Sequence, residues 1–152
     1  MNADYRRTVE ALDALLREVP EPLTAVKLAP DKWSLREILG HLVDSAANNH
    51  QRFVRLQEPG PLRFPGYEAE RWVHTQRYNL FPWAPLVALW RAYNQLILHV
   101  LEQARPERLP NVWQTADGPL TLEWLARDYY RHLGDHAEHF RLRLAELQGK
   151  PA

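Results

Sequence analysis

The sequence contains no cysteine. Disulfides, thiolate metal ligands and a cysteine nucleophile are therefore excluded, and any metal site must be built from His, Asp and Glu. A thiol that took part in the chemistry would have to come from a separate small molecule. Serine is almost absent as well, since only Ser34 and Ser45 occur. Because the pattern around Ser34 assigns it to the start of a helix, we do not expect a Ser-His-Asp hydrolase.

Neither sign of charge is in excess, because 19 Lys and Arg balance 19 Asp and Glu. Nucleic-acid binding usually needs a basic patch, and the chain has no run of Lys or Arg, so we expect no nucleic-acid partner. No apolar run approaches the roughly 20 residues that span a bilayer. The N-terminal stretch "MNADYRRTVEALDALLREV" lacks the apolar block and cleavage site of a signal peptide. We therefore expect a cytoplasmic protein with no membrane partner.

Several familiar catalytic motifs are missing too. The chain has no H-E-x-x-H, no E-x-x-H of the di-iron bundles, no G-x-S-x-G, no P-loop and no G-x-G-x-x-G. These absences exclude zincins, di-iron bundle proteins and the common nucleotide-binding folds as templates for this protein.

Twelve prolines divide the 152 residues into long proline-free stretches with helical periodicity. Four amphipathic helices without a strong strand pattern predict an all-α protein, a four-helix bundle forming a single domain over residues 1–152. A capping box at Ser34 and Glu37 predicts the start of the second helix, and Thr121 is the expected cap of the fourth. The expected spans are 2–19, from Ser34 to near Gln57, from near Pro85 to about 100, and from Thr121 to about 147. The long connection 58–82 is expected to hold a short helix, and Asp117-Gly118 a small hairpin.

The fourth expected helix carries three of the seven histidines, within "YYRHLGDHAEHFRLRL". At about 100° per residue, His132, His136, His139 and Arg143 fall on one line, roughly a quarter turn from the apolar stripe. The second helix has the same layout: His41, Ser45, Asn48 and Arg52 form a line at the border of its apolar face.

Two such lines can face each other across a groove of the bundle, where one His could meet an i,i+4 His pair. Three imidazoles with an open coordination position are typical of a catalytic divalent-metal site. An H-x-x-x-H pair is a weak signal on its own, however, because surface helices carry such pairs by chance. From the residues alone, a metal site and a set of ordinary surface or packing histidines both remain open.

Three blocks of the sequence resemble a known family. "WSLREILGHLVDSAANNHQRFVR" resembles the second helix of the DinB/YfiT-like superfamily, "FPGYEAERWV" is similar to the element that precedes its third helix, and "LTLEWLARDYYRHLGDHAEHF" resembles its last helix. The resemblance covers roughly residues 33–144. It implies a DinB-like four-helix bundle with one divalent metal, zinc or nickel, bound by three side chains. Carried over by position, these are His41, His132 and His136; another register would select Asp135 and His139.

The resemblance also implies what the site does. Some relatives transfer a low-molecular-weight thiol such as bacillithiol or mycothiol, one isomerises maleylpyruvate with mycothiol, and others are regarded as metal-dependent hydrolases. We therefore expect a small-molecule enzyme that activates a thiol or water, a thiol S-transferase or a hydrolase. The alternative is a non-catalytic binding or interaction protein stabilised by the metal. A homodimer is common among similar proteins and is one possible state here, because the sequence does not fix the oligomeric state.

Other residues near the expected site have two interpretations each. Arg52 and Arg143 could bind an acidic substrate or the carboxylate of a thiol cofactor, although solvated or salt-bridged positions are the simpler expectation. Asp44 could orient the His41 ring, but a solvated charge is the simpler expectation. Tyr67 and Trp72 could cover the groove as a lid, while Trp72 is expected to cap the bundle core.

Overall fold

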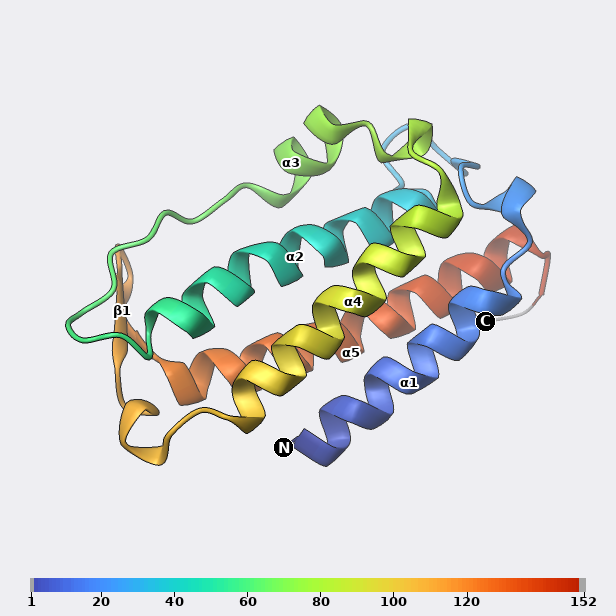
Figure 1. Ribbon diagram of the computed structural model, residues 1–152. Coiled ribbons are helices and arrows are strands. Elements are labelled where there is room, and N and C mark those ends of the chain that lie inside the picture. The colour runs from blue at the N-terminus through green and yellow to red at the C-terminus, as the bar shows by residue number, and fades with distance from the viewer. Residues whose placement is uncertain (1, 151–152) are drawn as a thin grey trace.

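The computed structural model describes residues 2–150 and consists mainly of four long helices. These are α1 (Asn2–Glu18), α2 (Leu35–Arg55), α4 (Trp83–Glu102) and α5 (Leu122–Leu147). The helix α1 packs against α4 and α5, and α2 packs against the same two helices (Figure 1). Consecutive helices α1 and α2 therefore lie on opposite sides of the bundle. The predicted all-α four-helix bundle is confirmed.

The helix starts follow the signals in the sequence. Ser34 accepts a hydrogen bond from the backbone of Glu37, whose side chain accepts one in return, so the predicted capping box is present. Thr121 caps α5 through the backbone N–H of Trp124. The third long helix begins at Trp83, two residues before the predicted start, with Pro85 in its first turn. A proline is tolerated there because the first turn has no intrahelical partner for its backbone N–H groups.

The connection between α2 and α4 contains the predicted short helix, α3 (Ala69–Gln76), which lies over α2 (Figure 1). The predicted hairpin is present as β1 (Val112–Thr115) and β2 (Gly118–Thr121), and its two turn residues are Ala116 and Asp117, one residue before the predicted pair Asp117-Gly118. Leu62 pairs with β1 through two backbone hydrogen bonds, at 3.0 and 3.1 Å. The long connection is thus attached to the hairpin at one end and to α2 at the other.

Short 3-10 helices complete the chain at Glu21–Leu23, Tyr78–Leu80 and Pro106–Arg108. Tyr78 packs its ring directly on the backbone of Gly40 in α2, and a Cβ at position 40 would overlap that ring. This close approach places the second 3-10 helix against the first turns of α2.

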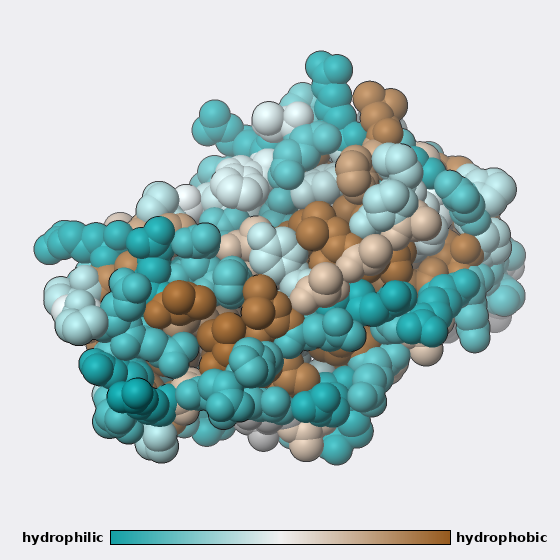
Figure 2. All heavy atoms as spheres, viewed as in Figure 1, coloured by the Kyte–Doolittle hydropathy of each residue, from teal (hydrophilic) through white to brown (hydrophobic). Residues whose placement is uncertain are grey.

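The core lies between the four long helices. Its largest fully buried side chains include Trp90, Phe53 and Phe140, together with leucines from every long helix. One polar group sits in the middle of it: Asn94 accepts hydrogen bonds from the hydroxyls of Tyr5 and Tyr129, both at 2.9 Å. The outer face of α4 is partly apolar, because Leu89 and Leu96 are exposed on it. Figure 2 shows hydrophobic side chains, in brown, gathered in this region of the surface. None of the described helices is long and apolar enough to cross a membrane.

Candidate metal centre

His41 reaches the candidate site from the second turn of α2 and is only 4% exposed. The capping box fixes where α2 begins, and His41 follows Ser34 by seven residues, or two turns. The capping box therefore determines which face of α2 carries His41. The whole line of His41, Ser45, Asn48 and Arg52 is buried, so it faces the interior and not the border of the core as expected.

His132 and His136 lie one turn apart on α5 and are half-buried. Their ring centroids are 4.5 Å apart, and they lie 5.2 and 4.6 Å from the ring of His41. The Nε2 atoms of His41 and His132 are 3.2 Å apart. One ring nitrogen from each of the three residues lies within 4.8 Å of the other two. The tertiary structure thus brings together the three histidines that the sequence analysis selected.

The surroundings hold these imidazoles neutral. Burial, followed by the proximity of His136 and His132, lowers the pKa of His41 from 6.5 to about 3. Burial and the neighbouring His132 lower the pKa of His136 to about 4, and burial lowers that of His132. At neutral pH all three rings therefore keep a free lone pair, which is the form that binds a metal ion.

Two buried ring nitrogens support the fit to a cation. Nδ1 of His41 and Nδ1 of His136 are buried and form no hydrogen bond. Buried polar atoms without partners are rare in proteins and often mark a missing ion or water. Among residues 2–150, this is the one group of three or more His, Asp or Glu side chains close enough to hold a metal. A neutral three-histidine donor set suits a borderline divalent ion such as zinc or nickel.

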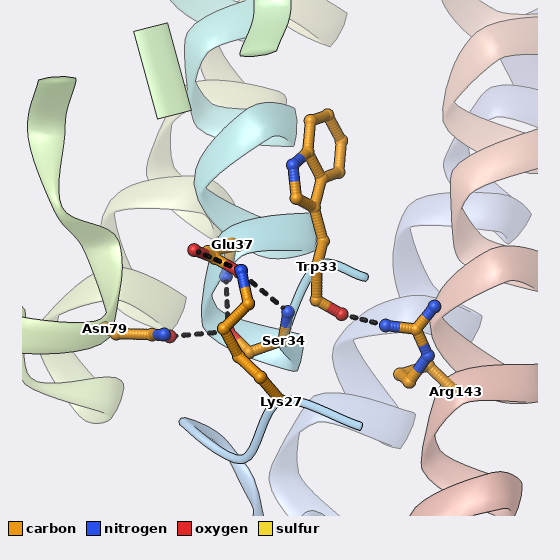
Figure 3. A network of polar contacts seen from close by, with 6 residues as sticks. All are labelled: Lys27, Trp33, Ser34, Glu37, Asn79 and Arg143. Atoms are coloured by element: carbon orange, nitrogen blue, oxygen red, sulfur yellow. Dashed lines mark hydrogen bonds and ion pairs between the residues drawn. The ribbon is translucent and has the colours of Figure 1, made fainter. Parts of the chain in front are cut away.

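His41 also contacts Trp33, which is not part of the histidine cluster. The indole of Trp33 lies 5.1 Å from the His41 ring, between centroids. The guanidinium of Arg143, on α5, donates a hydrogen bond to the backbone carbonyl of Trp33, and Figure 3 shows the indole pointing away from that bond. Figure 3 also shows the capping box of Ser34 and Glu37 directly after Trp33. The residues that start α2 therefore also link it to α5 beside the cluster.

Comparisons with known proteins agree with this geometry. A family model described as the DinB superfamily matches residues 4–140. The chain belongs to the DinB superfamily. Comparison with curated proteins finds no matching sequence.

Solved structures of similar shape support the same fold. YfiT from Bacillus subtilis, described as a probable metal-dependent hydrolase with an unusual four-helix bundle topology, superposes with a TM-score of 0.81 at 17% identity. That match covers 99% of this chain and 89% of YfiT. A mycothiol-dependent maleylpyruvate isomerase superposes with a TM-score of 0.73 at 11% identity, over 90% of this chain and 57% of the isomerase. At these identities the two structures establish the fold alone.

The residues of the alternative register lie elsewhere in this DinB-superfamily chain. Asp135 is exposed and forms an ion pair with Arg131 at 2.7 Å. His139 is half-buried, with its ring centroid 5.8 Å from that of His136, and it is not part of the three-histidine group. The geometry therefore favours His41, His132 and His136 over Asp135 and His139.

Asp44 occupies a different environment from the one expected. It is 2% exposed, and its Oδ1 accepts hydrogen bonds from the Tyr78 hydroxyl at 2.6 Å and from Gln76 at 2.7 Å. The expectation of a solvated charge is wrong, because the connection before α4 folds over α2 and covers Asp44. Burial raises the pKa of the Asp44 carboxyl. No hydrogen bond joins Asp44 to His41 in the described structure.

The two arginines were expected to be solvated or salt-bridged; both are buried, Arg143 is salt-bridged, and Arg52 is neither solvated nor paired with a carboxylate among the described residues. Arg143 is 7% exposed and already engaged, with Trp33 and with Glu146 at 2.9 Å. Arg52 is 8% exposed and lies over the ring of Trp113, a residue that the sequence analysis did not single out. Nothing local in the sequence signals this pairing, because it depends on how the hairpin packs against α2.

Trp72 does not cap the core as expected. It is 40% exposed, and its ring stands 5.0 Å from that of Tyr67, between centroids. Both rings line a cleft between the α3 segment and the β1–β2 hairpin, which is described below.

Proposed function

We propose that this protein is a metal-dependent enzyme in which His41, His132 and His136 hold one divalent ion, zinc or nickel. The observation that carries the proposal is the convergence of three neutral ring nitrogens, from two helices, within 4.8 Å of one another. No fourth protein ligand stands beside them among the described residues. Three protein ligands leave a coordination position for a reactant, as in catalytic sites, whereas structural sites are usually closed by a fourth.

A divalent ion in this position would supply a Lewis acid that lowers the pKa of water or of a small thiol, so that a nucleophile forms at neutral pH. The protein's own part is to hold the three imidazoles neutral and oriented. Burial keeps them deprotonated, and the packing of Trp33 fixes the plane of His41.

Two reactions are compatible with this site: hydrolysis and transfer of a low-molecular-weight thiol. The fold shared with YfiT, described as a probable metal-dependent hydrolase, supports the first. The fold shared with a mycothiol-dependent isomerase supports the second. With no cysteine in the chain, the thiol in the second case must come from a separate cofactor.

Metal analysis of the untagged protein tests the site. We expect about one divalent ion per chain, and loss of that ion in His41→Ala, His132→Ala and His136→Ala. The control is His99→Ala, because His99 is exposed on α4 and far from any cluster of ligands. If the three site variants kept their ion while remaining folded, the proposed site would be wrong.

A stability measurement separates an enzyme from a metal-stabilised binding protein. Removal of a catalytic ion should leave the bundle folded, because its core does not depend on the ion, whereas loss of a structural ion lowers the melting temperature strongly. Turnover of an electrophile that requires both the metal and an added thiol such as bacillithiol or mycothiol would identify the transferase. Turnover of an ester or amide without a thiol would identify the hydrolase.

A further inference from the structure

Arg52 is a buried cation without a counter-charge. It is 8% exposed, and no carboxylate forms an ion pair with it anywhere in residues 2–150. Its Nη1 donates one hydrogen bond to the side-chain oxygen of Asn49 at 3.2 Å. Its Nε is buried and makes no hydrogen bond. Most of the five N–H donors of this guanidinium thus have no acceptor that the protein supplies.

Such an arrangement is costly in a folded protein. A buried charge is normally paired with an opposite charge, because the free energy lost on removing it from water is not compensated otherwise. Burial lowers the pKa of Arg52, which reflects the same cost. The stacking on Trp113, with Cζ 4.2 Å from the ring centroid, offsets part of it, since a cation over an indole face gains about 0.5–2 kcal/mol. The unused edge of the guanidinium has the geometry that binds a carboxylate through two parallel hydrogen bonds.

The indole of Trp113, which stacks on Arg52, also lines a large cleft, although Arg52 itself is not among the lining residues. Trp113 lines an opening of about 1190 Å³ between the α3 segment and the β1–β2 hairpin, together with Phe64, Tyr67, Trp72 and Leu120. These five side chains are aromatic or apolar, as in many pockets for small molecules, while half of all the lining residues are polar or charged. The lining also carries charges of both signs, Glu68 and Arg71 on the α3 segment and Asp117 in the hairpin turn.

Tyr67 relates the cleft to the histidine cluster. The Tyr67 ring lines the cleft, and its hydroxyl forms a hydrogen bond with Ser45. Burial and the nearby Asp44 raise the pKa of this hydroxyl, and the hydrogen bond with Ser45 opposes that increase. Ser45 lies one turn from His41 on the buried polar line of α2. On the same line Arg52 is 11 residues beyond His41, or roughly 16 Å along the helix axis. The cluster, the Tyr67 hydroxyl and Arg52 therefore follow one face of α2.

We propose that Arg52 and Trp113 form a subsite for the carboxylate end of an extended organic acid whose aromatic or apolar body lies in this cleft. The inference rests on the proposed function only for the other end of the ligand, which would reach the histidine cluster. Arg143 is not part of this subsite, because its guanidinium is already bound to Trp33 and Glu146.

The test uses a simple aryl acid as the probe. Binding of 4-phenylbutyrate and of its neutral amide is followed by NMR titration, with the indole N–H signal of Trp113 as the reporter. We expect the acid to shift this signal and the amide to bind at least about tenfold more weakly, as expected for loss of a charge-assisted pair. Equal binding of the acid and the amide would overturn the subsite.

Arg52→Met removes the charge and keeps the length of the side chain. It should weaken binding of the acid at least about tenfold and leave binding of the amide unchanged. The matched control is Arg17→Met on α1, because Arg17 is exposed, pairs with Asp13 of its own helix and does not line the cleft. Unchanged affinity for the acid in Arg52→Met would also overturn the proposal.

Thermal unfolding separates a ligand-binding role from a structural one. If Arg52 is kept for a ligand, Arg52→Met should melt at the same temperature as the wild type or higher, since a buried unpaired charge has been removed. A lower melting temperature with unchanged binding would identify Arg52 as a structural residue and contradict the subsite.

The outcome is independent of the metal proposal. The titration is repeated on His132→Ala, in which the proposed metal site is broken, and the metal content of Arg52→Met is measured. Arg52-dependent binding without any metal in the wild type would refute the metal centre and keep the subsite. A bound metal together with acid binding that does not depend on Arg52 would support the metal centre and refute the subsite.

Discussion

The Nε2 atoms of His41 and His132 lie 3.2 Å apart although 91 residues separate them in the chain. Two imidazole nitrogens can approach so closely only if at least one ring is neutral, and burial keeps the rings of the cluster neutral. The same contact joins α2 to α5. Metal binding and the packing of these two helices are therefore linked through the same side chains.

The metal-free protein should lose stability as the pH falls below about 6.5. In the folded state the pKa is lowered to about 3 for His41 and about 4 for His136, so the unfolded chain binds these protons first. The free energy of unfolding is therefore highest above about pH 6.5, the pKa of these histidines in the unfolded chain. It falls as the pH decreases toward the pKa values of the folded state, by at most about 1.4 kcal/mol per pH unit for each histidine. Urea unfolding of chelated protein between pH 7 and 5 measures this slope. The double variant His41→Gln/His136→Gln should show a shallower slope, and an equally steep one would contradict the assignment.

Gly40→Ala should destabilise the fold by about 1–3 kcal/mol, because the added methyl group overlaps the ring of Tyr78. The ring cannot easily move aside, since its hydroxyl is bonded to the buried Asp44 at 2.6 Å. Gly134→Ala on α5 is the matched control: a Cβ there meets nothing within 4 Å. That variant should gain about 0.5–1 kcal/mol from the helix propensity of alanine. Similar unfolding midpoints for the two variants would show that the Tyr78 contact is looser than described.

Asn94→Leu should be strongly destabilising, by roughly 1–3 kcal/mol, because the Tyr129 hydroxyl loses its acceptor and the Tyr5 hydroxyl keeps only the backbone carbonyl of residue 94, at 3.3 Å. Asn94 accepts from Tyr5 and Tyr129 in the core, and its own amide donates to the carbonyl of Trp90 at 2.8 Å. Adding Tyr129→Phe to Asn94→Leu should recover part of the loss, because one orphaned hydroxyl is removed. Denaturant unfolding of the four members of this double-mutant cycle gives the coupling energy. Strictly additive effects would mean that the two side chains do not share a hydrogen bond.

Arg143→Met should destabilise the protein by about 1–3 kcal/mol, because it leaves the Trp33 carbonyl without its donor. It should also weaken metal binding, since Trp33 packs on His41. Chemical denaturation and a competitive metal titration measure the two effects. Arg141→Met is the control, because Arg141 is exposed and pairs only with Glu138, and it should change neither quantity. An unaltered metal affinity in a folded Arg143→Met protein would show that Trp33 does not position His41.

The cytoplasmic location, the single domain over 1–152, the homodimer and the absence of nucleic-acid and membrane partners remain predictions. So do the identity of the metal and the choice between thiol and water.

Local signals in the sequence determined the four helices, their caps and the histidine spacing. Ser34, Glu37 and Thr121 act on backbone groups within three residues, and apolar periodicity places His132 and His136 on one face of a helix without any distant contact. For this reason the bundle could be predicted from the sequence, whereas the choice of His41, His132 and His136 as ligands also needed the resemblance to the DinB/YfiT-like superfamily.

Only the tertiary structure decided that His41 meets the pair on α5, that Asp44 is covered by Tyr78 and Gln76, and that Arg52 lies over Trp113 without a counter-charge. Each of these contacts joins segments more than 30 residues apart, and each depends on which part of α2 faces α5, the long connection or the hairpin. A periodic pattern gives the face of a helix on which a side chain lies, but burial and charge pairing depend on what packs against that face.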